Sequence, residues 1–212
     1  MGVAIRTAGE GDREQVVRLL DSAFRDDPVS NWIFPGEALP RAHHRLMGAF
    51  TDMVMADGRI DLLEDGTGCA LWLPVPGKGQ EGGHEEGHGE GPEEDGGGDD
   101  AVRLREAVDP GNPRVEQIAR LTSGIHPEDR AHEYLWMIGV APERQGEGLG
   151  ALLIGAVLDR CDRDGMPAYL EASSARSRGL YERLGFEVLG APLELPDGGP
   201  TMWPMWREPH PS

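Results

Sequence analysis

Cysteine and long apolar runs are scarce in this sequence of 212 residues. Its two cysteines, Cys69 and Cys161, fall in a predicted strand and a predicted helix, where a buried and reduced thiol is the common state. No apolar run approaches the length that crosses a bilayer, and the first residues lack the basic-then-apolar pattern of a signal peptide. We therefore expect a cytoplasmic protein without a membrane partner.

Positive charge is also in short supply. Lys and Arg number 20 against 38 Asp and Glu, which gives a formal net charge of −18 and argues against a nucleic-acid partner or an anionic membrane. The hydrophobic share of 38% is somewhat below the globular average, whereas Gly and Pro are abundant. We expect a single domain over residues 1–212 that combines an ordinary core with one solvated segment.

That solvated segment is residues 77–100, which consist almost entirely of Gly, Glu, Asp and His. Residues 81–100 hold nine acids and no Lys or Arg, so half of the net charge lies there. Such a stretch cannot bury enough apolar surface to offset its ordering entropy. We predict a disordered insertion within the domain. His84 and His88 have metal-ligating side chains, but no rigid frame holds them, so we interpret them as part of a solvated loop and expect no bound metal.

Hydrophobic spacing predicts the other elements. The residues at 28–36 form an apolar loop in this interpretation, and Asp65-Gly66 predicts a tight antiparallel hairpin. Alternation along the last strand puts Trp203 and Met205 on one face and Trp206 on the other. The predicted strands cover residues 3–7, 58–65, 68–73, 134–140, 167–173, 186–189 and 201–206, and the predicted helices cover residues 11–24, 38–55, 101–108, 113–123, 151–163 and 176–184.

The most informative stretch joins a buried strand to a helix through a glycine-rich turn. The apolar run from Tyr134 to Val140 ends before Pro142, which cannot donate to a sheet ladder. Gly146, Gly148 and Gly150 follow at alternate positions, and a helical apolar pattern begins directly after them. Glycines let the backbone approach an anion, and the first helical turn offers unpaired N–H groups. The arrangement predicts a phosphate-binding turn.

Two motifs carry a resemblance to a known family. The stretch V-A-P-E-R-Q-G-E-G-L-G, residues 140–150, resembles the acetyl-CoA motif of the GNAT superfamily of N-acetyltransferases. The stretch L-Y-E-R-L-G-F, residues 180–186, resembles the L-Y-x-x-x-G-F signature near the C-terminal end of these enzymes. The resemblance extends over residues 3–207 apart from the acidic insertion. It implies an α/β (α+β) fold with a mixed, mostly antiparallel central sheet flanked by helices.

The resemblance also implies a function, which is transfer of an acetyl group from acetyl-CoA to a primary amine of a small molecule or peptide. In the superfamily, the strand before the turn pairs with the pantetheine arm, and the turn amides hold the pyrophosphate. An Asn that contacts the pantetheine in many members is replaced here by Ser174. The cofactor-binding residues that the resemblance implies are Ile138, Gly139, Val140, Arg144, Gln145, Gly146, Glu147, Gly148, Leu149, Gly150, Ala151, Ser174 and Tyr181.

Catalysis needs a polarised thioester carbonyl, a neutral amine and a proton for the departing thiolate. A backbone N–H near residues 138–140 would polarise the carbonyl, and Tyr181 resembles the family's general acid. Glu133 lies where some members carry a basic carboxylate, and we name it as the candidate base. His132, Glu171 and a chain of waters remain alternatives. Arg144 and Arg176 are further candidates for phosphate contacts.

The acceptor site is predicted at the early apolar loop, because in the family the loop between the first two helices borders the acceptor cleft. Trp32 and Phe34 are the acceptor-site candidates. The sequence does not name the acceptor, and we leave open whether the chain forms a homodimer.

Three alternatives accompany this interpretation. A dinucleotide-binding fingerprint fits poorly, since residues 141–145 separate strand from glycines and the preceding strands form a hairpin. A non-catalytic acyl-CoA-binding or regulatory module would keep the same fold. The acidic insertion could instead be the functional part, as a tether for a basic protein.

Overall fold

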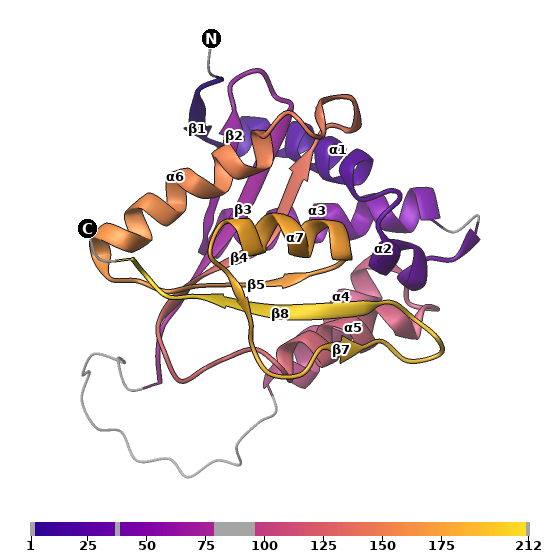
Figure 1. Ribbon diagram of the computed structural model, residues 1–212. Helices are drawn as coiled ribbons and strands as arrows, with labels where there is room; N and C mark the ends of the chain where they lie inside the picture. Colours follow the sequence, from indigo (N-terminus) through magenta and orange to yellow (C-terminus); the bar gives the residue numbers. More distant parts are fainter. Residues whose placement is uncertain (1–2, 37–38, 79–95, 211–212) are drawn as a thin grey trace, which may run out of the picture.

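The structure is a computed structural model that describes residues 3–36, 39–78 and 96–210 (Figure 1). Its strands form one mixed sheet in the order β1-β2-β3-β4-β5-β8-β6, and β7 pairs with β8 outside this path. All strand pairs are antiparallel except β4 with β5, as the predicted mixed sheet requires. The strands are β1 (Ile5–Thr7), β2 (Arg59–Leu63), β3 (Gly68–Val75), β4 (His132–Val140), β5 (Ala168–Ala172), β6 (Glu187–Val188), β7 (Leu193–Glu194) and β8 (Thr201–Arg207).

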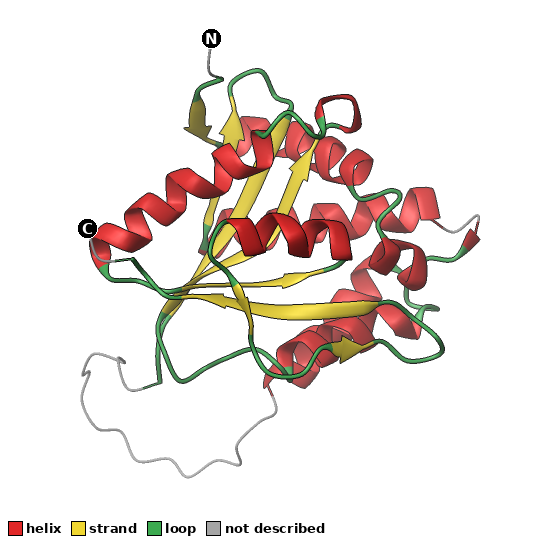
Figure 2. Cartoon of the chain, viewed as in Figure 1, coloured by secondary structure: helices red, strands yellow, loops and turns green. Residues whose placement is uncertain are grey.

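Helices cover both faces of the sheet (Figure 2). One apolar cluster joins the sheet to α1, α2, α3 and α5, and a second joins it to α6 and α7. Met202 belongs to the first cluster, whereas Met205 and Trp203 belong to the second, which confirms the predicted alternation of the last strand. The helices are α1 (Arg13–Ala23), α2 (Pro28–Ile33), α3 (Leu39–Asp57), α4 (Gly96–Val108), α5 (Pro113–Ser123), α6 (Leu149–Asp164) and α7 (Ala175–Arg183), with short 3-10 turns at Glu10–Asp12 and Pro142–Arg144.

Strands β4 and β5 separate soon after they meet. Their parallel pairing is limited to Glu133 with Ala168 and Tyr134 with Tyr169. Farther along, β4 continues to pair with β3 through to Val140, so within the described chain its β5-facing edge has no strand partner beyond Tyr134. The sheet is thus open at its centre, with α6 and α7 on one side of the opening.

A β-bulge in β4 shapes this opening. The register with β3 pairs Leu135 with Trp72 and Met137 with Leu71, so Trp136 is the extra residue. Trp136 and Met137 consequently both pack with the cluster that includes α1 and α3, whereas Ile138 packs on the α6 side. A bulge bends its strand and redirects its side chains. Here it turns two large side chains toward the same face.

Some boundaries differ from the predicted ones. The apolar loop at 28–36 contains α2, because Pro28 suits a first helical position and Asp27 accepts hydrogen bonds from the amides of Val29 and Ser30. Helix α4 begins at Gly96, so the predicted insertion at 77–100 is too long at this end. Residues 79–95, with His84 and His88, lie outside the described residues, and the disorder predicted for them stays a prediction. In the part of the chain that the structure describes, no helix is long and apolar enough to cross a membrane.

Candidate functional site

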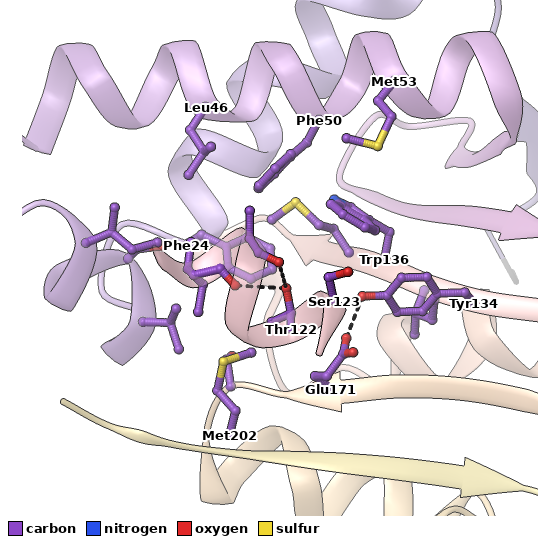
Figure 3. A pocket seen from close by; sticks show the side chains of 18 of the residues that line it. Phe24, Leu46, Phe50, Met53, Thr122, Ser123, Tyr134, Trp136, Glu171 and Met202 are labelled. Atoms are coloured by element: carbon purple, nitrogen blue, oxygen red, sulfur yellow. Dashed lines mark hydrogen bonds between the residues drawn. The ribbon is translucent and has the colours of Figure 1, made fainter. Parts of the chain in front are cut away.

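A cavity of about 520 Å³ lies beside the opening between β4 and β5 (Figure 3). Its walls come from β4, β5, β8, α2, α3, α4, α5 and α7 and from the loops that follow α1, α5 and β5. Most of the wall is apolar, with Phe24, Phe50, Trp136 and Met202 among the large side chains. The polar groups that reach it include Glu171 and Tyr134, whose side chains meet at one side.

The predicted phosphate turn has the required backbone. Gly146 and Gly148 adopt φ values of 89° and 83°, the left-handed region that favours glycine. Open space surrounds both positions, since a Cβ added there would meet no protein atom within 4 Å. In the described chain, the amides of residues 148–151 donate to no protein acceptor, and these are the first N–H groups of α6. The turn therefore fits a pyrophosphate group.

The side chains of the turn are occupied within the protein. The Arg144 guanidinium donates to Glu147 at 2.8 Å and to Asp65 at 3.2 Å, and these contacts raise its pKa. The Gln145 amide donates to the carbonyl of Val140 at 3.2 Å. These contacts hold the loop against the β2–β3 turn and the end of β4. Arg144, Gln145 and Glu147 thus shape the turn, and its free amides remain available to an anion.

Ser174 serves as the N-cap of α7. Its Oγ accepts from the Ser177 amide at 3.1 Å and lies 2.9 Å from the Ser177 hydroxyl. The Ser174 amide in turn donates to that hydroxyl at 3.2 Å. The hydroxyl that stands in place of the family's Asn is therefore engaged in a reciprocal cap. Arg176, the second residue of the same helix, is exposed.

Tyr181 lines the cavity from α7 and is 6% exposed. Its ring packs edge-on against Phe186 at 6.1 Å between centroids. Burial, and then the charge of Asp27, raise the pKa of the phenol, so it stays protonated at neutral pH. No described residue accepts a hydrogen bond from the hydroxyl, which is thus free for a ligand.

Glu171 is an unusual carboxylate because it is buried and only half satisfied. Its side chain is 5% exposed, and Oε2 accepts a 2.6 Å hydrogen bond from the Tyr134 hydroxyl. Oε1 is buried without a hydrogen-bond partner among the described residues. The His126 imidazole lies farther away, with Nδ1 3.9 Å from Oε1. A buried carboxylate oxygen without a hydrogen bond is costly, so this oxygen is available to accept one from a ligand in the cavity.

His126 and His132 extend the site away from Glu171. The His132 Nδ1 lies 2.8 Å from the Arg130 carbonyl and must donate to it, because a carbonyl only accepts. Burial lowers the pKa of His132, which favours the neutral ring with this single N–H. Its Nε2 then accepts from Nε2 of His126 at 3.2 Å, which leaves Nδ1 of His126 facing Glu171. His126 lines the cavity, but as an isolated histidine in a loop it gave no signal in the sequence.

Glu133 does not share this location. Successive residues of a strand face opposite sides, and Tyr134 faces the cavity. The carboxylate of Glu133 lies outside the cavity lining and on the α6 side, where its charge contributes to the raised pKa of Cys161. The structure therefore does not support Glu133 as the base, and the alternative Glu171 faces the cavity instead.

The two acceptor-site candidates are core residues. Phe34 is fully buried and packs edge-on against His43. Trp32 is 7% exposed and donates from Nε1 to the carbonyl of Pro196 at 3.0 Å. Neither lines the cavity, so the cavity does not support their assignment to the acceptor site, which stays a prediction. The helical turn of α2 directs Val29, Ser30 and Ile33 toward the cavity in their place.

The β4 segment proposed to meet the cofactor lies beside the opening. Ile138 lines the cavity, and Val140 accepts the Gln145 hydrogen bond. Gly139 has a packing reason for lacking a side chain: a Cβ there would come within 3.1 Å of Leu20 and 3.2 Å of Ala23 on α1. Helix α1 can therefore lie close against the strand that borders the opening.

Comparisons with known proteins agree with this architecture. Residues 116–186 match the model of the Acetyltransferase (GNAT) family. An uncharacterized N-acetyltransferase of Schizosaccharomyces pombe is 42% identical over 53 residues, which are 25% of this chain and 22% of that protein. A mycothiol acetyltransferase of Brachybacterium faecium is 38% identical over 64 residues, 29% of this chain and 19% of that protein. The matched segments thus span about a fifth of these relatives.

Solved structures match over nearly the whole chain. One described as histone acetyltransferase HPA2 and related acetyltransferase from Corynebacterium glutamicum has a TM-score of 0.65 at 24% identity and covers 100% of this chain and 99% of its own. A mosquito arylalkylamine N-acetyltransferase like 5b has a TM-score of 0.64 at 16% identity. The match covers 98% of this chain and 100% of that one. The resemblance is thereby confirmed: the chain has the GNAT fold, and the segment from within α5 to the residue before β6 matches the GNAT family's sequence.

Proposed function

We propose that this protein transfers an acetyl group from acetyl-CoA to a primary amine. One observation carries the proposal. A single cavity beside the opened sheet is lined by the free hydroxyl of Tyr181 and the unpaired carboxylate of Glu171, and the strand that borders it leads to a turn with free amides. Such a site can hold a thioester at one end and an amine at the other.

The donor would bind along β4. Its pyrophosphate fits the amides of residues 148–151, where the helix dipole favours an anion. Its pantetheine arm would take the unpaired edge of β4 beyond Tyr134, as an added strand would. The acyl end then reaches the cavity beside Ile138 and Tyr181.

The reaction needs one bond to form and one to break. The amine nitrogen bonds to the thioester carbonyl carbon, and the carbon–sulfur bond breaks with its electron pair on sulfur. An ammonium substrate loses two protons on the way to the amide: one ends on the CoA sulfur and the other leaves to solvent. Tyr181 is placed to donate a proton to the sulfur and to regain one from the amine side.

The ammonium proton that leaves to solvent has a route on the side of the cavity away from Tyr181. Glu171 receives the ammonium, and Nδ1 of His126 is the nearest basic nitrogen, 3.9 Å from the carboxylate. His132 holds His126 through their 3.2 Å contact and keeps this nitrogen toward the cavity. His126 is 17% exposed, so its proton can pass to water.

The names of the relatives support acetyl transfer, and the arylalkylamine N-acetyltransferase among the structural neighbours supports an amine acceptor. The two buried thiols fit the reducing cytoplasm, where we place the reaction. The rival function, a non-catalytic acyl-CoA-binding module, shares the turn but does not require Tyr181 and Glu171 in one cavity.

The test is release of CoA thiol from acetyl-CoA in the presence of a panel of primary amines, with mass spectrometry of the acetylated product. Acetyl-CoA binding is measured in parallel by calorimetry. Thiol release with product formation supports the enzyme. Acetyl-CoA binding without turnover on any amine would favour the binding module, and no binding at all would overturn the assignment of the turn.

A further inference from the structure

The acceptor side of the cavity is selective in charge. Among the described residues that line it, none is arginine or lysine. The unpaired anionic oxygen within it is Oε1 of Glu171, on a side chain that is 5% exposed. An acceptor that carried a carboxylate would bring a second anion into this space with no cation to meet it.

The other acids on the wall are already satisfied or lie at the rim. Asp27 is the N-cap of α2, and its second oxygen accepts from the Ser173 hydroxyl at 2.6 Å. Glu128 is 57% exposed and pairs with Lys78, and Asp100 is 76% exposed beside Arg103. Among the acids on the described wall, Glu171 is thus the one that is buried and still has an oxygen without a hydrogen bond.

The space around Glu171 is apolar. Phe50 and Trp136 lie across the cavity from it, with ring centroids 5.3 Å apart in an edge-to-face pair (Figure 3). Tyr134 extends this aromatic wall, since its ring lies 5.3 Å from that of Trp136. Leu46, Met53 and Met202 complete the surface. Apolar walls with few polar groups bind apolar ligand bodies and orient them by the polar groups.

We propose that the acceptor is a monocationic primary amine on an aromatic or aliphatic body, with its ammonium group on Glu171 and no anionic group of its own. This inference rests on the proposed function and narrows its substrate class. It excludes free amino acids, because their carboxylate would lie close to Glu171 with no Arg or Lys on the described wall to pair with it. It disfavours diamines, because their second ammonium would lose its water among mostly apolar side chains.

Two matched pairs of amines test the class without any mutation. Phenethylamine and phenylalanine differ by the carboxylate, and pentylamine and 1,5-diaminopentane differ by the second amine. Thiol release should give kcat/KM at least about 100-fold higher for phenethylamine than for phenylalanine, because like charges in a site of low dielectric repel strongly. Pentylamine should exceed the diamine at least about 10-fold. Equal or reversed preference in the first pair would overturn the proposal.

Glu171→Gln tests the anchor. The amide keeps an oxygen that can accept from Tyr134, but it removes the charge. The KM for phenethylamine should rise at least about 10-fold, while the Kd for acetyl-CoA stays within about twofold. Glu187→Gln is the control, since it makes the same change on an exposed residue of β6 outside the cavity. An unchanged KM in Glu171→Gln, with a melting temperature equal to that of the wild type, would contradict the anchor role.

A direct binding measurement separates this inference from the proposed function. Calorimetry of phenethylamine is performed on the protein saturated with CoA, which cannot react. Binding that Glu171→Gln abolishes supports the amine site even if no thiol is released, in which case the enzymatic proposal alone fails. Turnover on amino acids in preference to phenethylamine would support the proposed acetyltransferase activity but overturn the proposed substrate class.

Discussion

Replacing Tyr181 by Phe separates the chemistry of this residue from its packing. The ring lies in the apolar cluster of α6 and α7 and contacts Phe186, and both features survive in phenylalanine. The hydroxyl has no hydrogen-bond partner in the described chain, so its removal leaves no group unsatisfied. We expect the free energy of unfolding to change by less than about 0.5 kcal/mol.

Turnover should respond much more strongly. If the phenol protonates the departing thiolate, kcat should fall about 100-fold, which corresponds to about 2.7 kcal/mol of lost transition-state stabilisation. The raised pKa of Tyr181 keeps it protonated into the alkaline range, so the wild-type pH profile should show no loss of activity from this group below about pH 10.

The assay is thiol release at saturating amine across pH 6–10, with acetyl-CoA affinity measured separately. Thr51→Val is the control, because it removes a buried hydroxyl that donates within α3 to the Met47 carbonyl and does not line the cavity. Its kcat should remain within about threefold of the wild type. Wild-type turnover of Tyr181→Phe at every pH would show that Tyr181 is a packing residue only.

Three further predictions concern the turn, the core and the thiols. Gly148→Val forces a branched side chain into a positive φ and toward the free amides of the turn, so the acetyl-CoA Kd from calorimetry should rise at least about 10-fold. Gly190→Val is the control, because this glycine also has a positive φ of 70° but lies outside the turn, and the Kd should stay unchanged. Phe34→Ala should lower the free energy of unfolding in urea by about 3–5 kcal/mol with little change in the KM for the amine. A changed KM without loss of stability would show instead that Phe34 contacts the acceptor. Burial raises the pKa of Cys69 to about 12 and that of Cys161 to about 11, so neither should react with a disulfide reagent at pH 8 until the protein unfolds; rapid labelling of the native protein would contradict their burial.

The sequence predicted those features that depend on local spacing. The glycine turn was evident because alternate glycines between an apolar strand and an apolar helix have few other uses, and the structure gives Gly146 and Gly148 the positive φ that this requires. The hairpin at Asp65-Gly66 and the faces of the last strand followed from turn chemistry and alternation. Tyr181 was found through its motif, and its position on the cavity agrees with that choice.

Features that depend on contacts distant in sequence were beyond the sequence patterns. The phase of β4 decides which of Glu133 and Tyr134 faces the cavity, and the bulge at Trp136 changes that phase within the strand. Trp32 and Phe34 were assigned by analogy to a loop, yet the capping of α2 by Asp27 turns both into the core. His126 meets Glu171 only because the loop after α5 passes β5, which no local pattern reports.

The opening between β4 and β5 has a consequence for the stability of the free protein. The β4 edge beyond Tyr134 has backbone groups that no described strand satisfies, so in the absence of ligand water must meet them. A donor that pairs with this edge completes the sheet and stabilises only the folded state, by about 2.7 kcal/mol at 100 times its Kd. The melting temperature should therefore follow the concentration of acetyl-CoA, and the amides of β4 from Trp136 to Val140 should exchange their hydrogens more slowly as the ligand fills the gap.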